Sequence, residues 1–443
     1  MRPFLSREQL GTAAVLAAMA LAVLDAGMVH VALPVLAESL GATPARATLV
    51  VSAYQLALVM ALLPCAHLAE SLGYRRLFVA GVGVFSGASL LCVLAPSLPL
   101  LVAARFLQGL GGAAIMALGI ALLRAALGSE RLGAAIGWNA LTVALCSAAA
   151  PTMGALILSF GSWQWLFLAG LPVGAVALLA ARALPEVAPT RRFINAASIA
   201  WYSVAVALLF AATEVTAMHL PTAVILVGAA IVCFALLVRR ETPIVPFDLL
   251  ARHPFRVSVI ASICCFTGQS AGLVALPFYL QTGLGYGPLA AGLILTCWPL
   301  AVAITSLAAS RAMRRVGTAA QCAAGGAILA IGLLLSAIVP VRETVVPLAA
   351  GALLCGVGFG LFQLANNRSM FLAAPDQRSA AAGGMQGTAR LTGQTAGTLM
   401  MSLIFTWNPS AVAPRIGLAI GAIFALAAAL VSIGRRVHPP CSP

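Results

Sequence analysis

Residues 10–33 of this 443-residue chain, LGTAAVLAAMALAVLDAGMVHVAL, form an apolar run that contains one charged side chain, Asp25. At about 1.5 Å per residue, a helix over this run is about 36 Å long, which exceeds the roughly 30 Å hydrocarbon core of a bilayer. The run therefore predicts a membrane-spanning helix with a carboxyl group inside the membrane.

The whole chain has the same apolar composition. It is 62% hydrophobic and 8% charged, with a mean hydropathy of +1.05, whereas soluble domains carry about 25% charged residues. The 25 basic and 11 acidic side chains are too few to cover soluble domains of this total length. We predict an integral membrane protein embedded in a lipid bilayer, and we exclude soluble enzymes, secreted scaffolds and disordered regulators.

Similar apolar runs recur along the chain, separated by charged residues or by Gly–Pro and Asn–Pro pairs. They predict an all-α polytopic membrane protein with about 14 transmembrane helices. A twelve-helix bundle of the same orientation would remain if the seventh and eighth runs were re-entrant or peripheral. The expected spans are 10–33, 47–68, 76–95, 98–122, 134–157, 163–182, 196–216, 220–238, 257–280, 288–312, 320–340, 345–368, 381–405 and 414–435.

The basic residues, all of them arginines, gather in alternate connections between these runs. Because positive charge is retained on the cytoplasmic side, this alternation predicts a cytoplasmic location for both termini. The formal net charge of +14 is thereby explained as a topology signal, and no nucleic-acid partner is expected.

Signatures of enzymes and metal sites are missing from the sequence. The chain has neither a G-x-x-x-x-G-K-[ST] phosphate loop nor an H-E-x-x-H zinc motif, and its loops are short. We expect no catalytic activity, no cofactor and no metal, and any energy that the protein uses would come from an ion gradient.

Three segments of the first half resemble motifs of the major facilitator superfamily. AHLAESLGYRR (66–76) is similar to the loop motif G-x-L-a-D-r-x-G-r-r, in which Glu70, Gly73 and Arg75 would form a gating latch. RFLQGLGGAA (105–114) is similar to R-x-x-q-G-x-g-a-a. APTMGALI (150–157) resembles the antiporter motif G-P-x-x-G-G, with Pro151 and Gly154 matching and alanines in place of two glycines.

Longer matches resemble one branch, the fourteen-helix drug/proton antiporters. LDAGMVHVALP (24–34) and WQWLFLAGLPVG (163–174) are similar to first-half signatures, and LQTGLGYGPLAAGL (280–293) and ARLTGQTAG (389–397) to second-half segments. The resemblance implies the major facilitator fold and a monomer. Its parts would be a six-helix bundle (1–190), two additional helices with a cytoplasmic linker (191–250) and a second six-helix bundle (251–443).

Three ionisable residues lie well inside the expected spans: Asp25, Arg105 and Arg390. Such residues are costly at mid-membrane and usually functional. Asp25 and Arg105 lie at similar depths, about 12 and 10 Å from the outer face. We predict that Asp25 carries the coupling proton with Arg105 beside it; a permanent structural ion pair is the alternative. The partner of Arg390 stays open between a helix C-terminus and polar groups of a neighbouring helix.

Polar and aromatic residues within the apolar runs are candidates for a central substrate cavity, since a large apolar pocket with few polar groups binds many lipophilic compounds. Hydrogen bonding between helices is the alternative for each. The last six spans contain no acidic residue. Because members of the resembled family that handle dications are expected to use additional acids in the second half, the resemblance implies monocationic, neutral or amphipathic substrates. The cavity candidates are Tyr54, Gln55, Trp138, Asn139, Gln269, Trp298, Gln363 and Gln386.

Together these features predict a proton-coupled secondary transporter of a bacterial cytoplasmic membrane. It would export lipophilic or cationic drugs and toxic compounds by alternating access. A proton-coupled uptake symporter and a narrow-substrate metabolite exporter are alternatives within the same fold. A channel or sensor is disfavoured because the chain has neither a repeated pore loop nor a signalling domain.

Overall fold

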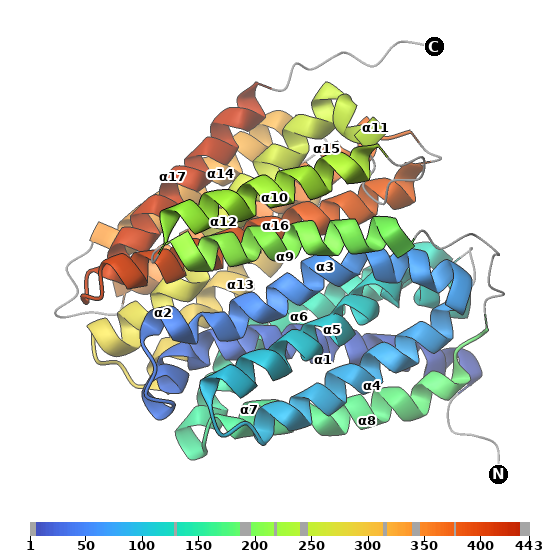
Figure 1. Cartoon of the computed structure of the whole chain (residues 1–443), viewed down its shortest axis with the longest axis horizontal. Coiled ribbons are helices and arrows are strands. Elements are labelled where there is room, and N and C mark those ends of the chain that lie inside the picture. The colour runs from blue at the N-terminus through green and yellow to red at the C-terminus, as the bar shows by residue number, and fades with distance from the viewer. Residues whose placement is uncertain are drawn as a thin grey trace.

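The computed structural model describes residues 6–127, 131–186, 196–216, 219–239, 247–312, 317–338, 346–375 and 378–434, which form a bundle of long helices (Figure 1). The predicted boundary at 190–191 lies outside these residues. The first half comprises α1 (Arg7–Ser39), α2 (Pro44–Ala47), α3 (Leu49–Leu72), α4 (Tyr74–Val93), α5 (Leu98–Leu127), α6 (Leu132–Phe160), α7 (Gln164–Leu168) and α8 (Leu171–Ala180).

The remaining helices follow after a short 3₁₀ turn, Ala181–Ala183. A π-turn at Tyr279–Gly283 directly follows α12 and continues it at its C-terminal end. The helices are α9 (Ala196–Thr216), α10 (Leu220–Val238), α11 (Phe247–Ala251), α12 (His253–Phe278), α13 (Pro288–Ala312), α14 (Thr318–Ile338), α15 (Val346–Ala373), α16 (Ser379–Trp407) and α17 (Ala413–Ile433).

Twelve helices of the described part are long and apolar enough to cross a membrane. The two other long helices, α9 and α16, do not reach this threshold in their described residues. For α16 the reason is its polar content, which includes Gln386, Arg390 and Gln394. In the bundle α16 nevertheless packs along α12 and α3.

Two expected spans differ in detail from the helices that form. The first was expected to end at residue 33, yet α1 continues through Pro34 to Ser39. Neighbouring helices in a membrane bundle can compensate for the hydrogen bond that a proline removes. The expected span 163–182 is divided into α7 and α8 at Ala169 and Gly170.

The same pattern of helix neighbours occurs twice along the chain. In the first half α3 and α4 pack on α5, and α1 packs on α6 and α8; in the second half α13 and α14 pack on α15, and α12 packs on α16 and α17. The two halves meet where α6 packs on α13 and where α3 packs on α16. These two contacts are equivalent in the repeat, because α3 corresponds to α13 and α6 to α16. Such internal repeats are typical of secondary transporters.

Helix α9 lies along the line where α3 meets α16 (Figure 1). The hydroxyl of Tyr202 donates a hydrogen bond to the carbonyl oxygen of Val59 in α3, at 3.0 Å. Helix α10 packs on α9 and exposes apolar side chains, among them Ile225 and Ile231. Those side chains are suited to face lipid.

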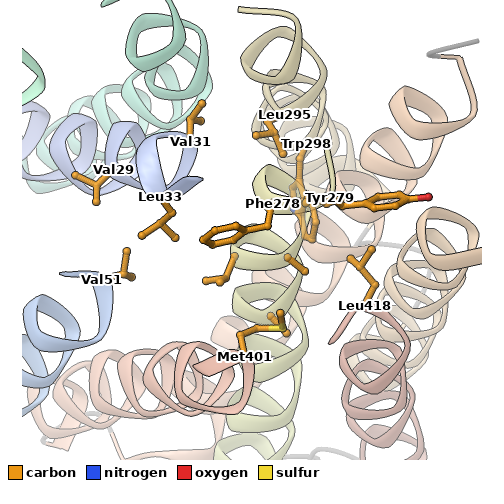
Figure 2. Close-up of a cluster of buried hydrophobic side chains, with 14 of the residues drawn as sticks. Val29, Val31, Leu33, Val51, Phe278, Tyr279, Leu295, Trp298, Met401 and Leu418 are labelled. Atoms are coloured by element: carbon orange, nitrogen blue, oxygen red, sulfur yellow. The ribbon is translucent and has the colours of Figure 1, made fainter. Parts of the chain in front are cut away.

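One apolar cluster joins the two halves at the end of the bundle that carries α2, called here the α2 end; the opposite end carries α11 (Figure 1). In Figure 2 the side chains of Val31 and Leu33 from α1 face those of Phe278 and Leu295 from the second half. Burial of large apolar side chains from both halves stabilises their contact at this end.

Candidate functional site

The structure brings Asp25 of α1 and Arg105 of α5 together inside the first half. Both residues are almost fully buried, with exposures of 5% and 1%. One terminal guanidinium nitrogen of Arg105 pairs with Asp25 Oδ2 at 2.5 Å, and Arg105 Nε donates to the carbonyl oxygen of Val50 at 3.2 Å. The matching depths expected from the sequence thus correspond to a direct ion pair.

Gln108 completes this pair and had not been identified from the sequence. It is fully buried one turn after Arg105; its Nε2 donates to Asp25 Oδ1 at 2.9 Å and to Ser89 Oγ at 2.8 Å, and its Oε1 accepts from Arg105. A signal was present, because the motif resembled by residues 105–114 carries a glutamine at this position. Both carboxylate oxygens of Asp25 therefore accept hydrogen bonds.

Aromatic rings enclose the guanidinium. Arg105 Cζ lies 4.3 Å from the ring centroid of Tyr54 and 5.6 Å from that of Phe167, within the range of cation–π attraction. These rings come from α3 and α7, so the ion pair is held between four helices of one half. A buried pair is tolerable only when its charges balance and its polar atoms are hydrogen-bonded, as they are here.

A cavity of about 70 Å³ adjoins Asp25 between α1, α4, α6 and the α7–α8 segment. Asp25 and Ser89 contribute polar atoms to its lining, and Met28, Leu166 and Val173 contribute apolar ones. This volume has room for a few water molecules, which could carry a proton to the carboxylate.

Replacement of Gln108 by leucine tests the part of the network that the sequence did not reveal. Asp25 Oδ1 and Ser89 would each lose a partner in a buried environment, so we expect Gln108→Leu to destabilise the protein by about 1–3 kcal/mol. Thermal unfolding of the purified protein measures this. Leu107→Ile, on the exposed side of the same helix, serves as the control and should change stability by less than about 0.5 kcal/mol. An equal loss in both variants would contradict the prediction.

The expected gating residues lie where α3 turns into α4. Gly73 has φ +92° and ψ 132°, a backbone conformation that other residues rarely adopt. Arg75 pairs with Glu186 Oε1 at 3.2 Å and donates to the carbonyl oxygen of Arg182 at 3.1 Å. Glu70 is half-buried. The sequence had placed the acid of the latch at Glu70 and did not single out Glu186.

The antiporter-like residues in α6 pack against both halves. A Cβ atom at Gly154 would lie 3.0 Å from Met28 Cα in α1, so glycine permits a close helix contact there. On the other side, a Cβ atom at Gly292 in α13 would lie 2.8 Å from the carbonyl oxygen of Pro151. Nearby, the hydroxyls of Thr152 and Thr296 are 2.6 Å apart. This motif thus forms part of the contact between the halves.

The eight cavity candidates do not share one surface. Gln55 Oε1 accepts a hydrogen bond from Thr398 of α16 at 2.9 Å, and Gln386 donates to Asn367 of α15 at 3.1 Å. Trp298, 1% exposed, packs in the apolar cluster of Figure 2, and its Nε1 is buried without a hydrogen-bond partner among the described residues. Trp138 is 54% exposed on α6.

The other candidates lie half-buried or buried inside the bundle. Gln363 is half-buried in α15. Tyr54 Oη, Asn139 Oδ1, Gln269 Oε1 and Arg390 Nε are inaccessible to solvent and have no hydrogen-bond partner among the described residues. Buried polar atoms normally have partners, so these atoms mark places where water or a ligand belongs.

The comparison with known proteins decides the family. Residues 15–398 match the family described as Major Facilitator Superfamily. The chain belongs to the major facilitator superfamily. It is therefore a transporter rather than an enzyme, with a small-molecule substrate and a multi-pass location in a membrane.

Among its relatives, the transporter is 39% identical to the uncharacterized transporter YebQ of Escherichia coli strain K12, over 95% of this chain and 94% of the relative. It is 30% identical to the multidrug resistance protein Stp of Mycobacterium tuberculosis, over 90% of this chain and 76% of Stp. The drug-efflux resemblance expected from the sequence is thereby confirmed. A solved structure of a peptide transporter POT in complex with sulfate superposes with a TM-score of 0.73 at 15% identity, covering 96% and 93% of the two chains, which supports the fold alone.

Proposed function

We propose that this transporter is a proton-coupled antiporter that exports lipophilic compounds, including drugs, across the cytoplasmic membrane of a bacterium by alternating access. The observation that carries the proposal is the ion pair of Asp25 with Arg105, because Asp25 is the one acidic residue inside the long helices at mid-membrane depth. The similarity of this chain to the multidrug resistance protein Stp supports export as the direction of transport.

The proposed topology has fourteen spans, with α9 and α16 crossing the membrane in addition to the twelve more apolar helices. Both termini and the α11 end then face the cytoplasm, and the α2 end faces outward. Arginines support this orientation, since Arg75, Arg131, Arg256 and Arg378 lie at the helix ends on the α11 side. The protein is proposed to act as a monomer with bundles 1–190 and 251–443 and additional helices within 191–250.

In this topology, the halves are closed on the outer side. The apolar cluster lies there, and Gln281 Nε2 of the α12 turn donates to the carbonyl oxygen of Val31 in α1 at 2.9 Å. Arg105 links this closure to the proton site, because it holds both Asp25 and Val50, and Val50 belongs to the cluster. The ionised pair thus corresponds to the state in which the proton has left for the cytoplasm.

Protonation of Asp25 removes the charge that balances Arg105. Antiport requires this protonation to occur while Asp25 faces the outside and the substrate has left, so that the neutral carrier returns to the inward-facing state. Release of the proton to the cytoplasm then restores the ion pair with the outer side closed, and substrate binding opens the outer contacts again. The coupling arises because the protonation state of Asp25 changes the relative stability of the inward-facing and outward-facing conformations.

Inverted membrane vesicles with an acidic lumen test this function. The probes are rhodamine 123 and fluorescein, which share the xanthene ring system and carry opposite net charges. We expect at least one dye to accumulate in vesicles that contain the transporter, and accumulation to collapse on addition of a protonophore. Acid-driven loss of preloaded dye would instead identify an uptake symporter, and transport indifferent to the proton gradient would contradict coupling.

A further inference from the structure

Arg390 is a charge that the proposed proton site does not use. It lies in the middle of α16, eleven residues from its first residue and seventeen from its last, or about 17 and 26 Å along the axis. Its Nε is buried without a partner, and no described residue pairs with its guanidinium. A charge in such a place is costly unless something balances it.

No acidic residue in the helices of the second half, and no free oxygen of Asp25, is available to balance this arginine. Helices α12 to α17 contain no aspartate or glutamate. Asp25, in the first half, has both carboxylate oxygens occupied by Arg105 and Gln108. The described part of the second half therefore carries an excess positive charge at Arg390, and its helices contain no carboxylate that could bind a cation.

Arg390 lies on the seam between the two halves. The next residue, Leu391, packs into the core cluster of the first half, and one turn before it a Cβ atom at Gly387 would lie 3.0 Å from the side chain of Leu62 in α3. Alternating access requires the halves to separate along this seam. A side chain at this depth and position would thus face the substrate path when the seam opens.

Tyr54 lies on the other side of the seam, in α3, and belongs to the same core cluster as Leu391, the residue next to Arg390. One face of its ring covers the guanidinium of Arg105, while its hydroxyl is buried with no partner. The Tyr54 hydroxyl and Nε of Arg390, on two helices that pack on each other at the seam, are buried donors without an acceptor among the described residues. The guanidinium fork matches the two oxygens of a carboxylate, and the tyrosine hydroxyl can donate a further hydrogen bond.

We propose that Arg390 and Tyr54 form a binding site for an acidic group of the substrate, a carboxylate or sulfonate on a lipophilic body. This inference rests on the proposed transport function and narrows its substrate class from lipophilic compounds to amphipathic anions. The apolar helices around the seam would contact the lipophilic part.

Equilibrium binding to the purified full-length protein tests the site without any proton gradient. Fluorescence anisotropy is measured with fluorescein as the anion and rhodamine 123 as the cation of the same ring system. We expect fluorescein to bind the native protein, and Arg390→Gln to weaken its binding about 10- to 100-fold, the range for a lost charge-assisted hydrogen bond. Arg390→Lys should recover part of the affinity, because it restores the charge but not the planar fork.

Arg368→Gln is the matched control, since it removes an arginine that is exposed near the α11 end of α15. It should bind fluorescein with the native affinity. Tyr54→Phe should weaken binding several-fold while leaving the ring over Arg105 in place. Absence of fluorescein binding to the native protein, preference for rhodamine 123, or equal fluorescein affinity in Arg390→Gln would each overturn the anion site.

Thermal unfolding separates a binding role of Arg390 from a structural one. Because the charge of Arg390 is unbalanced in the native protein, the Arg390→Gln variant without ligand should unfold at the same or a higher temperature. Fluorescein should raise the unfolding temperature of the native protein and leave that of the variant unchanged. A lower unfolding temperature together with unchanged fluorescein binding would assign Arg390 to structure. Loss of gradient-driven transport with intact binding would instead overturn the transport proposal and leave the anion site standing.

Discussion

Asp25→Asn is expected to abolish proton-driven transport, with a loss of at least about 100-fold in the initial rate, because asparagine keeps the shape of the side chain but cannot exchange a proton. The amide also removes the negative charge opposite Arg105, which is 1% exposed. Transport is measured in inverted vesicles with an acidic lumen, using whichever xanthene dye the native protein accumulates.

The same substitution should destabilise the protein by about 3–5 kcal/mol, since it leaves the buried guanidinium of Arg105 without its counter-ion. The double variant Asp25→Asn/Arg105→Gln should recover most of this loss, because no buried charge remains. It should stay inactive in transport. Recovery of folding without recovery of transport would separate the proton role of Asp25 from a purely structural role of the pair.

Asp248→Asn is the control for this prediction. Asp248 pairs with Arg378 at the α11 end, where both side chains are exposed, and exposed ion pairs contribute about 0–1 kcal/mol. Native transport and stability are expected in this variant. Retention of gradient-driven transport by Asp25→Asn would show that another group carries the proton.

The second large effect is expected from Gly292→Val, which should reduce transport about 100-fold while both halves remain folded. A Cβ atom at this glycine would lie 2.8 Å from the backbone oxygen of Pro151, so the larger side chain prevents α6 and α13 from closing at the α2 end. A backbone atom cannot move aside as a flexible side chain can. The halves should therefore stay apart on the proposed outer side.

Accessibility of a cysteine at Thr296 reports this opening. Thr296 faces Thr152 across the same contact, so a membrane-impermeant maleimide added from outside should label Thr296→Cys faster when Gly292→Val is also present. Gly83→Val, in α4, is the matched control because a Cβ atom there meets open space. Unchanged labelling and normal transport in Gly292→Val would disprove a gating contact between α6 and α13.

The sequence predicted the arrangement of the site best for residues whose depth in the membrane is enough to bring them together. Asp25 and Arg105 are the charged residues at matching depths in the first half, and a helix rise of 1.5 Å per residue allowed them to be placed at one level. Gln108 was harder to find, because an amide in an apolar helix has no preferred partner until the neighbouring helices are known. Glu186 was equally hidden, since it meets Arg75 only after the chain has passed through the five helices α4 to α8.

The sequence by itself determined that this protein is a bundle of long membrane helices with a buried acid and two buried arginines. The physical reason is that lipid offers the backbone no hydrogen-bond partners, so long apolar runs must form helices whichever neighbours they pack against. Only the tertiary structure decided which charges meet. Apolar helices of similar composition can pack in many orders, and the arrangement that forms gives Arg105 a carboxylate, an amide and an aromatic ring while Arg390 has no acidic partner among the described residues.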